Sequence, residues 1–125
     1  MFKTGCLFFF GLLCISIKAI AQSGPSSPSK KEMEDARIAN AKKAAAMQFQ
    51  YFIIKAANET YGYSVFADGN LYIQQTTVPA IKGNIGFADT ASAGKIARLV
   101  IEKIKNGEMP PTVTIGEMKK LKAIQ

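Results

Sequence analysis

The dipeptide Asp68-Gly69 constrains the fold of this chain more than any other short stretch. It separates two runs, Tyr61 to Phe66 and Leu71 to Gln75, that are rich in aromatic and β-branched side chains, as strands are. Asp-Gly between two such runs is the strongest short-range signal for a β-hairpin. The segment from Gln48 to Ala57 has the same strand-like composition. The sequence therefore predicts three antiparallel strands, of which the last two form a hairpin.

Two registers are open to this hairpin, and they differ in the face that each side chain occupies. A two-residue loop pairs Phe66 with Leu71 and mixes polar with apolar positions further along the strands. A three-residue loop with Gly69 left-handed pairs Val65 with Leu71 and separates the two kinds of side chain. We expect the second register, with an apolar core face (Tyr61, Tyr63, Val65, Leu71 and Ile73) and an uncovered face (Gly62, Ser64, Tyr72 and Gln74).

The segment after the hairpin predicts the main helix of the protein. Asp89 or Thr90 caps its start, the helix runs to about Asn106, and Gly107 follows as a left-handed stop. Apolar residues recur at helical spacing along it, which indicates that one face packs against a core. The members of this stripe are Ala93, Ile96, Ala97, Val100, Ile101 and Ile104.

The C-terminal residues complete the predicted fold. Pro110-Pro111 is incompatible with a helix and favours extended chain. Thr114 and Glu117 have the spacing of a capping box, which predicts a short last helix. The sequence thus predicts a small two-layer α+β domain, in which one main amphipathic helix packs on a three-stranded antiparallel sheet made of a strand plus a hairpin.

Residues 1–21 have the features of a secretory signal peptide. Lys3 supplies a positive charge, residues 6–17 are almost entirely apolar, and Ala19-Ile20-Ala21 offers small residues for cleavage after Ala21. The alternative is an uncleaved membrane anchor, but the apolar run is shorter than the roughly 20 residues of a spanning helix. We therefore expect a secreted or periplasmic protein with no transmembrane segment after cleavage.

A spacer separates this predicted signal from the domain. Residues 22–29 are rich in Pro, Ser and Gly, which suits a linker. Residues 30–46 are rich in alanine and charge and predict a spacer that is either helical or frayed. We therefore divide the mature chain into a linker and spacer at 22–46 and a domain at 47–125.

The residue types of the mature chain argue against catalysis. Cleavage removes Cys6 and Cys14, and the chain contains no histidine, so the usual general base, thiol nucleophile and zinc ligands are missing. Asp68-Gly69-Asn70 resembles part of a calcium loop but lacks the other carboxylates and the closing glutamate. We expect no catalytic residues, no metal site and no cofactor, and the protein is predicted not to be an enzyme.

The stretch from Ile81 to Phe87 (IKGNIGF) looks most like a ligand-binding motif. Lys82 precedes both glycines, whereas a phosphate-binding loop carries its lysine after them. We interpret the stretch as a hinge whose glycines adopt backbone angles that other residues resist and whose Ile85 and Phe87 pack against the domain. Binding of an anion at its tip is the alternative. The candidate ligand-binding residues of the whole chain are Tyr72, Gln74, Lys82, Asn84 and Arg98.

Three stretches resemble a known family: YGYSVFADGNLYIQQ, VPAIKGNIGF and AGKIARLVIEKIKNGEMPPTVTI. They are similar to a group of small secreted or envelope proteins of Bacteroidetes, catalogued as domain of unknown function number 4907. The resemblance spans Tyr61 to Leu121, and its most specific parts are the Gly-Phe before the main helix and the Pro-Pro-Thr after it. Gln74-Gln75-Thr76 lacks the His and Pro that the family often carries at this strand exit. The resemblance implies an envelope location and no particular activity.

These observations predict a non-catalytic module that binds another envelope or extracellular protein. The alternative is a binder of anionic polysaccharide that uses a modestly basic surface containing tyrosines. The net charge of +7 falls to +5 when Lys3 and Lys18 leave with the signal, and such diffuse charge does not indicate a nucleic-acid partner.

Overall fold

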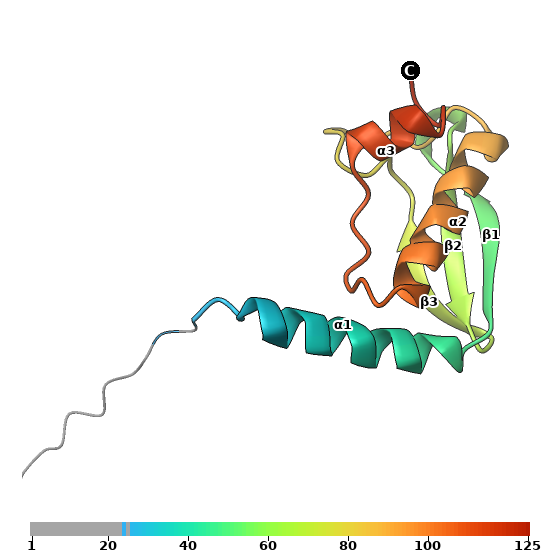
Figure 1. The fold of residues 1–125 in the computed structure, drawn as a ribbon. Helices are drawn as coiled ribbons and strands as arrows, with labels where there is room; N and C mark the ends of the chain where they lie inside the picture. Colours follow the sequence, from blue (N-terminus) through green and yellow to red (C-terminus); the bar gives the residue numbers. More distant parts are fainter. Residues whose placement is uncertain (1–23, 25) are drawn as a thin grey trace, which may run out of the picture.

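The three predicted strands form one antiparallel sheet. In the computed structural model, which describes residue 24 and residues 26–125, the sheet order is β1 (Phe49–Lys55), β2 (Tyr61–Ala67) and β3 (Asn70–Gln75). The main helix, α2 (Thr90–Lys105), lies along one face of this sheet (Figure 1). The predicted α+β fold is therefore confirmed. The predicted signal peptide lies outside the described residues, so it stays a prediction.

The turn between β2 and β3 is shorter than predicted. Asp68 and Gly69 both have positive φ, at 51° and 80°, and Ala67 pairs with Asn70. The loop therefore has two residues and not three. Two-residue loops in which both residues have positive φ are favoured in hairpins because their twist matches the twist of the strands.

A β-bulge in β3 restores the alternation of core-facing and outward-facing side chains, which a two-residue loop with regular strands would reverse in β3. Phe66 pairs with Leu71, whereas the next residue, Val65, pairs with Ile73, so β3 carries Tyr72 as an extra residue. A bulge shifts the later residues by one position and turns their side chains to the other face. The predicted pairing of Val65 with Leu71 is therefore wrong. Leu71 lies on the face away from the core and is 53% exposed.

The core lies between the sheet and the apolar stripe of α2. Asp89 caps this helix by accepting a hydrogen bond from the Ser92 amide at 2.6 Å, and Gly107 ends it with a φ of 82°, both as predicted. The stripe is buried except at the half-buried Ile101. The buried residues that the sheet, α2 and the segment before it supply to the core are Tyr63, Val65, Val78, Phe87, Ala93, Ile96, Ala97, Val100 and Ile104.

The loop between β3 and α2 is fastened to the sheet at Phe87. The Phe87 amide donates to the Tyr61 carbonyl at 2.7 Å, and the Tyr61 amide donates back at 2.9 Å. The Phe87 ring is buried, with its centroid 6.4 Å from that of Tyr63. Gly86 permits this approach, because a Cβ there would lie 2.5 Å from the Tyr61 carbonyl oxygen. The predicted packing of Phe87 is confirmed.

A short helix follows the Pro-Pro segment, as the capping box predicts. α3 (Ile115–Lys120) begins after Thr114, whose hydroxyl accepts a hydrogen bond from the Glu117 amide while the Glu117 carboxylate accepts one from the Thr114 amide. Met118 is fully buried against the core. α3 lies beside the N-terminal half of α2 (Figure 1).

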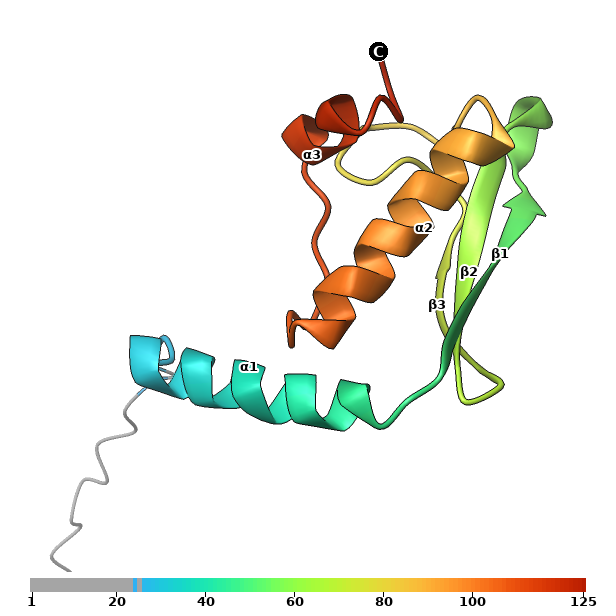
Figure 2. The ribbon, with the colours of Figure 1, turned by 45° about the vertical axis from the view of Figure 1, so that its right-hand side comes forward.

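The spacer before β1 is a helix, α1 (Lys30–Ala45), which decides between the two forms that the sequence left open. It crosses the C-terminal end of α2 and extends away from the sheet (Figure 2). Its Ala44 is buried, and its Arg37 Nε donates to the Asn106 carbonyl at 3.1 Å. Because α1 has no continuous apolar stripe, contacts of this kind rather than a large core hold it in place.

Gly107 marks the place where α1 meets the end of α2. A Cβ at this position would overlap the backbone oxygen of Arg37. We therefore expect Gly107→Ala to lower the free energy of unfolding by more than the roughly 1–2 kcal/mol of a left-handed alanine, and to release α1 from α2. Chemical denaturation and amide hydrogen exchange along α1 measure the two effects.

Gly69→Ala is the matched control for this variant. Gly69 also has positive φ, but a Cβ there meets nothing within 4 Å. Gly69→Ala should lower the free energy of unfolding only by the cost of placing alanine in the left-handed region, and it should leave amide exchange in α1 unchanged. Equal protection of the α1 amides in both variants would contradict the contact between α1 and Gly107.

Candidate binding surfaces

The face of the sheet that points away from α2 carries exposed apolar side chains. We call it the outer face, and strand pairing assigns to it Gln50, Phe52, Ile54, Gly62, Ser64, Phe66, Leu71 and Gln74. Phe52 and Leu71 are 54% and 53% exposed. No element among residues 26–125 covers this face (Figure 2), and none of its residues is charged.

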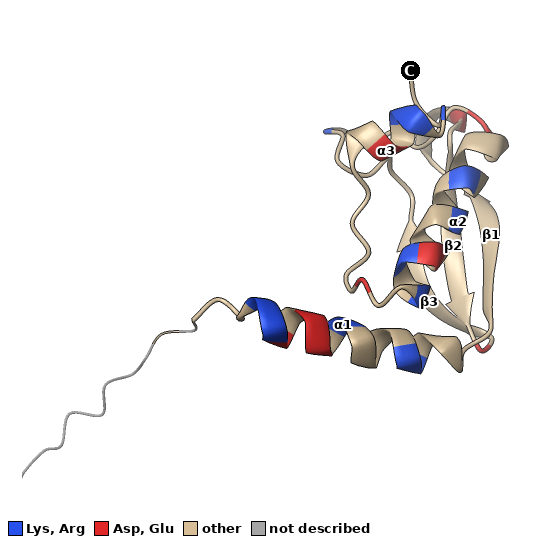
Figure 3. Ribbon diagram, viewed as in Figure 1, with Lys and Arg blue, Asp and Glu red and all other residues tan. Residues whose placement is uncertain are grey.

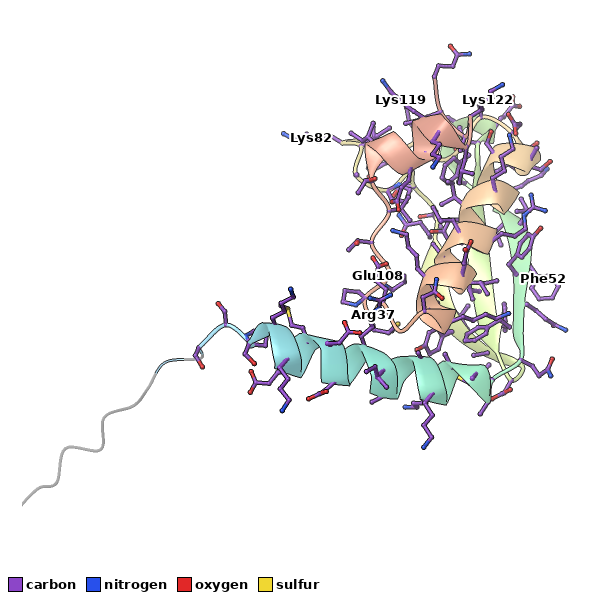
Figure 4. The ribbon with its side chains drawn as sticks, in the orientation of Figure 1. Arg37, Phe52, Lys82, Glu108, Lys119 and Lys122 are labelled. Atoms are coloured by element: carbon purple, nitrogen blue, oxygen red, sulfur yellow. The ribbon has the colours of Figure 1, made fainter. Side chains whose placement is uncertain are left out.

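An aromatic pair organises the centre of the outer face. Phe52 of β1 meets Phe66 of β2 edge to face, with ring centroids 5.4 Å apart and an interplanar angle of 89°. This is a favourable aromatic geometry. Ser64 lies directly opposite Phe52 in the ladder and is only 5% exposed, so the small side chain leaves room for the larger ones around it. Figure 4 shows Phe52 pointing away from the body of the protein.

The β1 edge of the sheet adjoins the outer face. Among the residues that the structure describes, β1 pairs with β2 alone, so the other side of the strand presents main-chain N–H and C=O groups. Natural edge strands usually avoid pairing by means of proline or several charges, yet β1 (FQYFIIK) has no proline and a single charge at Lys55. At the opposite edge, by contrast, Pro110 and Pro111 line a hollow with Ile73 of β3.

The structure does not gather the five predicted binding residues at one place. Gln74 lies on the outer face, in the same row as Phe52. Tyr72, expected on that face, is the bulged residue instead and packs edge to face on Phe49, 6.1 Å between centroids. Its hydroxyl lies 3.8 Å from the Met109 sulfur. Phe49 packs against the core, so Tyr72 lies on the α2 side of the sheet.

The other three predicted residues lie on different elements. Lys82 and Asn84 are exposed at the tip of the loop before α2, and Arg98 is exposed on α2 itself. Phe52, by contrast, was missed, because the composition of its strand predicted burial. The alternation of the strand indicated the exposure of Phe52. Residues of one face repeat every second position, and the polar Gln50 precedes Phe52 on the same face.

The loop that carries Lys82 is not built as a phosphate cradle. Such a cradle needs several free backbone N–H groups that converge on one point. The Gly86 amide is instead taken by the Thr60 hydroxyl at 2.9 Å, and the Val78 amide donates to the Ile85 carbonyl at 3.0 Å. Gly83 has the positive φ (121°) that was predicted, whereas Gly86 is needed for close packing. Ile85 does not pack down as expected, because it is 58% exposed.

Lys103 joins three segments of the C-terminal half. Its Nζ donates to the Thr112 carbonyl at 2.5 Å and to Glu117 Oε1 at 2.7 Å, and it lies 3.6 Å from Glu108 Oε1. Burial by itself would lower the pKa of Lys103, but the hydrogen bond to Glu117 and the charges of Glu108 and Glu117 outweigh it and raise that pKa overall. Lys103 therefore links α2 to the Pro-Pro segment and to α3.

We expect Lys103→Met to destabilise the fold by about 2 kcal/mol, because it leaves charged and polar acceptors without their donor. Urea denaturation near neutral pH measures the change. Lys105→Met is the matched control, since it removes the same charge from an exposed position on the same helix, and it should cost less than about 0.5 kcal/mol. Equal costs for the two variants would contradict the structural role of Lys103.

The same ion pair predicts a dependence on pH. Hydrogen bonds from Lys103 and from the Thr114 amide lower the pKa of Glu117. A lowered pKa contributes stability that is present above the unfolded pKa of the group and is lost as the pH falls through its folded pKa. The stability difference between the wild type and Lys103→Met should therefore shrink at acid pH. A difference that stays constant from neutral to acid pH would argue against this pair.

Two general searches of the described residues give negative results. None of the helices has the length and apolar character that crossing a bilayer requires. The same part of the chain also brings together no group of three or more side chains suited to hold a metal ion.

Comparison with known proteins places the chain in a family. The family model described as "Domain of unknown function (DUF4907)" matches residues 54–120, more than half of the chain, so the protein belongs to this family. The matched range contains β2, β3, α2 and α3. Searches of the curated proteins and of the solved structures gave no match.

Proposed function

We propose that this chain is a non-catalytic binding module that acts in the periplasm or outside the cell and holds another protein against the outer face of its sheet. The observation that carries the proposal is the exposure of Phe52 and Leu71 on a sheet face that no described element covers. Contiguous exposed apolar side chains on a small soluble domain often mark an interaction site.

The chemistry of the outer face indicates what a partner would supply. The face has no charge, so a partner with an apolar and uncharged contact surface suits it best. Full burial of one large apolar side chain contributes about 1.5–3 kcal/mol, and Phe52 and Leu71 each have half of their surface available. The aromatic pair of Phe52 and Phe66 supplies the kind of rigid anchor that dominates protein interfaces.

The β1 edge adds a second source of affinity. A strand from the partner that pairs with β1 would gain main-chain hydrogen bonds, and its alternate side chains would lie over the outer face. The absence of proline from β1 and its single charge support this mode. The secretory signal predicted at residues 1–21 would bring the domain to a compartment where envelope and extracellular proteins are available.

The alternative function, binding of anionic polysaccharide, has less support. It relied on Lys82, Asn84 and Arg98 acting together with the tyrosines of the sheet. These residues lie on the loop tip, on α2 and on the α2 side of β3, so one polysaccharide segment would not find them on a single surface.

Site-specific photo-crosslinking in the cells that produce the protein tests the proposal. A photoreactive phenylalanine analogue replaces Phe52, and the matched control carries it at Ile38, an equally exposed apolar position on α1. We expect a discrete adduct with another protein from position 52 and none from position 38. Adding Leu71→Ser should lower the yield of this adduct about tenfold, because a second apolar contact is lost.

Three results would contradict the proposal. One is equal adduct formation from positions 52 and 38, and a second is an adduct that Leu71→Ser leaves unchanged. A third is an adduct composed of two copies of this chain, which would make the outer face a site of self-association. Thermal unfolding of each variant confirms that the fold is retained.

A further inference from the structure

The end of the molecule formed by α3 and the loop before α2 is basic. Lys119 and Lys120 belong to α3, Lys122 follows it, and Lys82 is at the tip of the loop. Figure 3 shows basic residues at this end, and Figure 4 shows Lys82, Lys119 and Lys122 pointing outward there. We call these four lysines the basic end. From the sequence alone the positive charge of the chain is expected to be diffuse, whereas the fold brings these four lysines to one end of the molecule.

The carboxylate of α3 does little to neutralise the basic end. Glu117 Oε1 lies 2.7 Å from Lys103 Nζ, and its other oxygen accepts hydrogen bonds from Thr114 at 2.9 and 3.1 Å. Glu117 thus balances Lys103, whose side chain is largely buried. Asp89 lines the same hollow as Lys122, but none of the four lysines forms a salt bridge among residues 26–125. Most of their charge is therefore available to an external partner.

The loop of residues 80–85 runs beside α3, so the exposed side chains of both lie at the same end of the molecule. On one flank, Pro79 lines a hollow together with Pro111 and Val113. On the other flank, Gly86 lines a hollow together with Lys122 and Ala123. The two views in Figures 1 and 2 agree that this loop runs beside α3.

Exposed isoleucines stand among the lysines of the basic end. Ile81 and Ile85 of the loop are 45% and 58% exposed, and Ile115 of α3 is 44% exposed. Closure of the loop by the Val78–Ile85 hydrogen bond and the pairing of Phe87 with Tyr61 fix its base. Ile81 and Ile85 are therefore exposed on a loop whose base is fixed to the domain.

We propose that the basic end binds the surface of an anionic lipid bilayer. Lysines near such a surface are attracted by its negative potential, and branched apolar side chains beside them enter the boundary between headgroups and acyl chains. An acidic polysaccharide would use the lysines but would leave the isoleucines in water. The combination of the two residue types, matched to the charge and the apolar interior of a bilayer, favours the lipid surface.

The basic end is separate from the outer face. In Figure 4, Phe52 and Lys82 lie on opposite sides of the molecule. Bilayer binding therefore leaves Phe52 and the β1 edge accessible, and the two proposals stand or fall independently.

Sedimentation with vesicles tests the proposal. The probes are vesicles of phosphatidylcholine with about one-third phosphatidylglycerol, and vesicles of phosphatidylcholine alone. The wild type and all variants are secreted and processed by the same cells, so that any contribution from residues 1–21 is common to them. The wild type is expected to bind the anionic vesicles, to bind the neutral ones far less, and to lose affinity as salt is added.

Two variants separate the contributions of charge and apolar surface. The triple variant Lys82→Gln/Lys119→Gln/Lys122→Gln should lower the partition coefficient about 100-fold, since each lysine at an anionic surface contributes about a factor of five. The double variant Ile81→Ser/Ile85→Ser keeps every charge and should lower it about tenfold or more. All five positions are exposed, and thermal unfolding checks that each variant is folded.

The matched control removes the same charge elsewhere. Lys30→Gln/Lys31→Gln/Lys42→Gln takes three exposed lysines from α1 and should change binding less than about threefold, which is the effect of net charge alone. A loss as large as that of the first triple variant would overturn the proposal, as would equal binding to neutral vesicles. Binding that the isoleucine double variant leaves unchanged, with equal retention of both proteins on a sulfated polysaccharide, would also overturn it and assign the basic end to polysaccharide.

Discussion

Within residues 26–125, α2 is the one long amphipathic helix, and it covers only one face of the three-stranded sheet. Most of the structure depends on this constraint. The stripe of α2, apart from the half-buried Ile101, is buried in one core with Tyr63 and Val65. α1 has the same length as α2 but no continuous apolar stripe. It contacts the rest of the protein through Arg37 and the buried Ala44, so it has little apolar surface to cover a second sheet face. α3 is too short to cover a sheet. The outer face is therefore bare, because residues 26–125 contain no further element that could bury it.

Lys103 shows how a small domain without disulfides orders its last segment. After α2 ends at Gly107, the chain has to return along the helix without regular structure, because two prolines remove backbone donors. The Lys103 ammonium meets the Thr112 carbonyl on this return and Glu117 on α3. Met118 of α3, which is fully buried, then packs into the core. The charge-assisted contact of Lys103 and the buried side chains of Val113, Met118 and Ala123 hold α3, and with it the lysines of α3, in place.

The features that sequence could predict are those coded by neighbours in the chain. The Asp89 cap, the Gly107 stop and the Thr114–Glu117 capping box all involve residues within a few positions of one another, and each was predicted correctly. The bulge at Tyr72 was missed, because a choice between two loop lengths assumes that both strands stay regular. The bulge allows the chain to keep the favoured two-residue turn and still place Ile73 on the core face of the sheet.

Features that depend on residues far apart in the chain could not be predicted from the sequence. The partners of Lys103 become neighbours only when the chain folds back after the prolines, and the sequence around Lys103 resembles any solvated helix face. The basic end has the same origin, since Lys82 and Lys119 are far apart in the sequence. Phe52 illustrates a different limit: an aromatic strand residue indicates a sheet, but it does not reveal whether anything covers the face to which it belongs.

The two exposed surfaces differ in the kind of partner that each could hold. An uncharged apolar face beside a free strand edge gains affinity from close packing and main-chain hydrogen bonds, which require a folded or strand-forming partner. Exposed lysines beside exposed isoleucines make few directional contacts and suit a surface that is itself fluid. Because Phe52 and Lys82 lie on opposite sides of the protein, occupation of one surface would orient the other toward solution. Taken together, the two proposals describe an adaptor that keeps a partner protein close to a membrane surface.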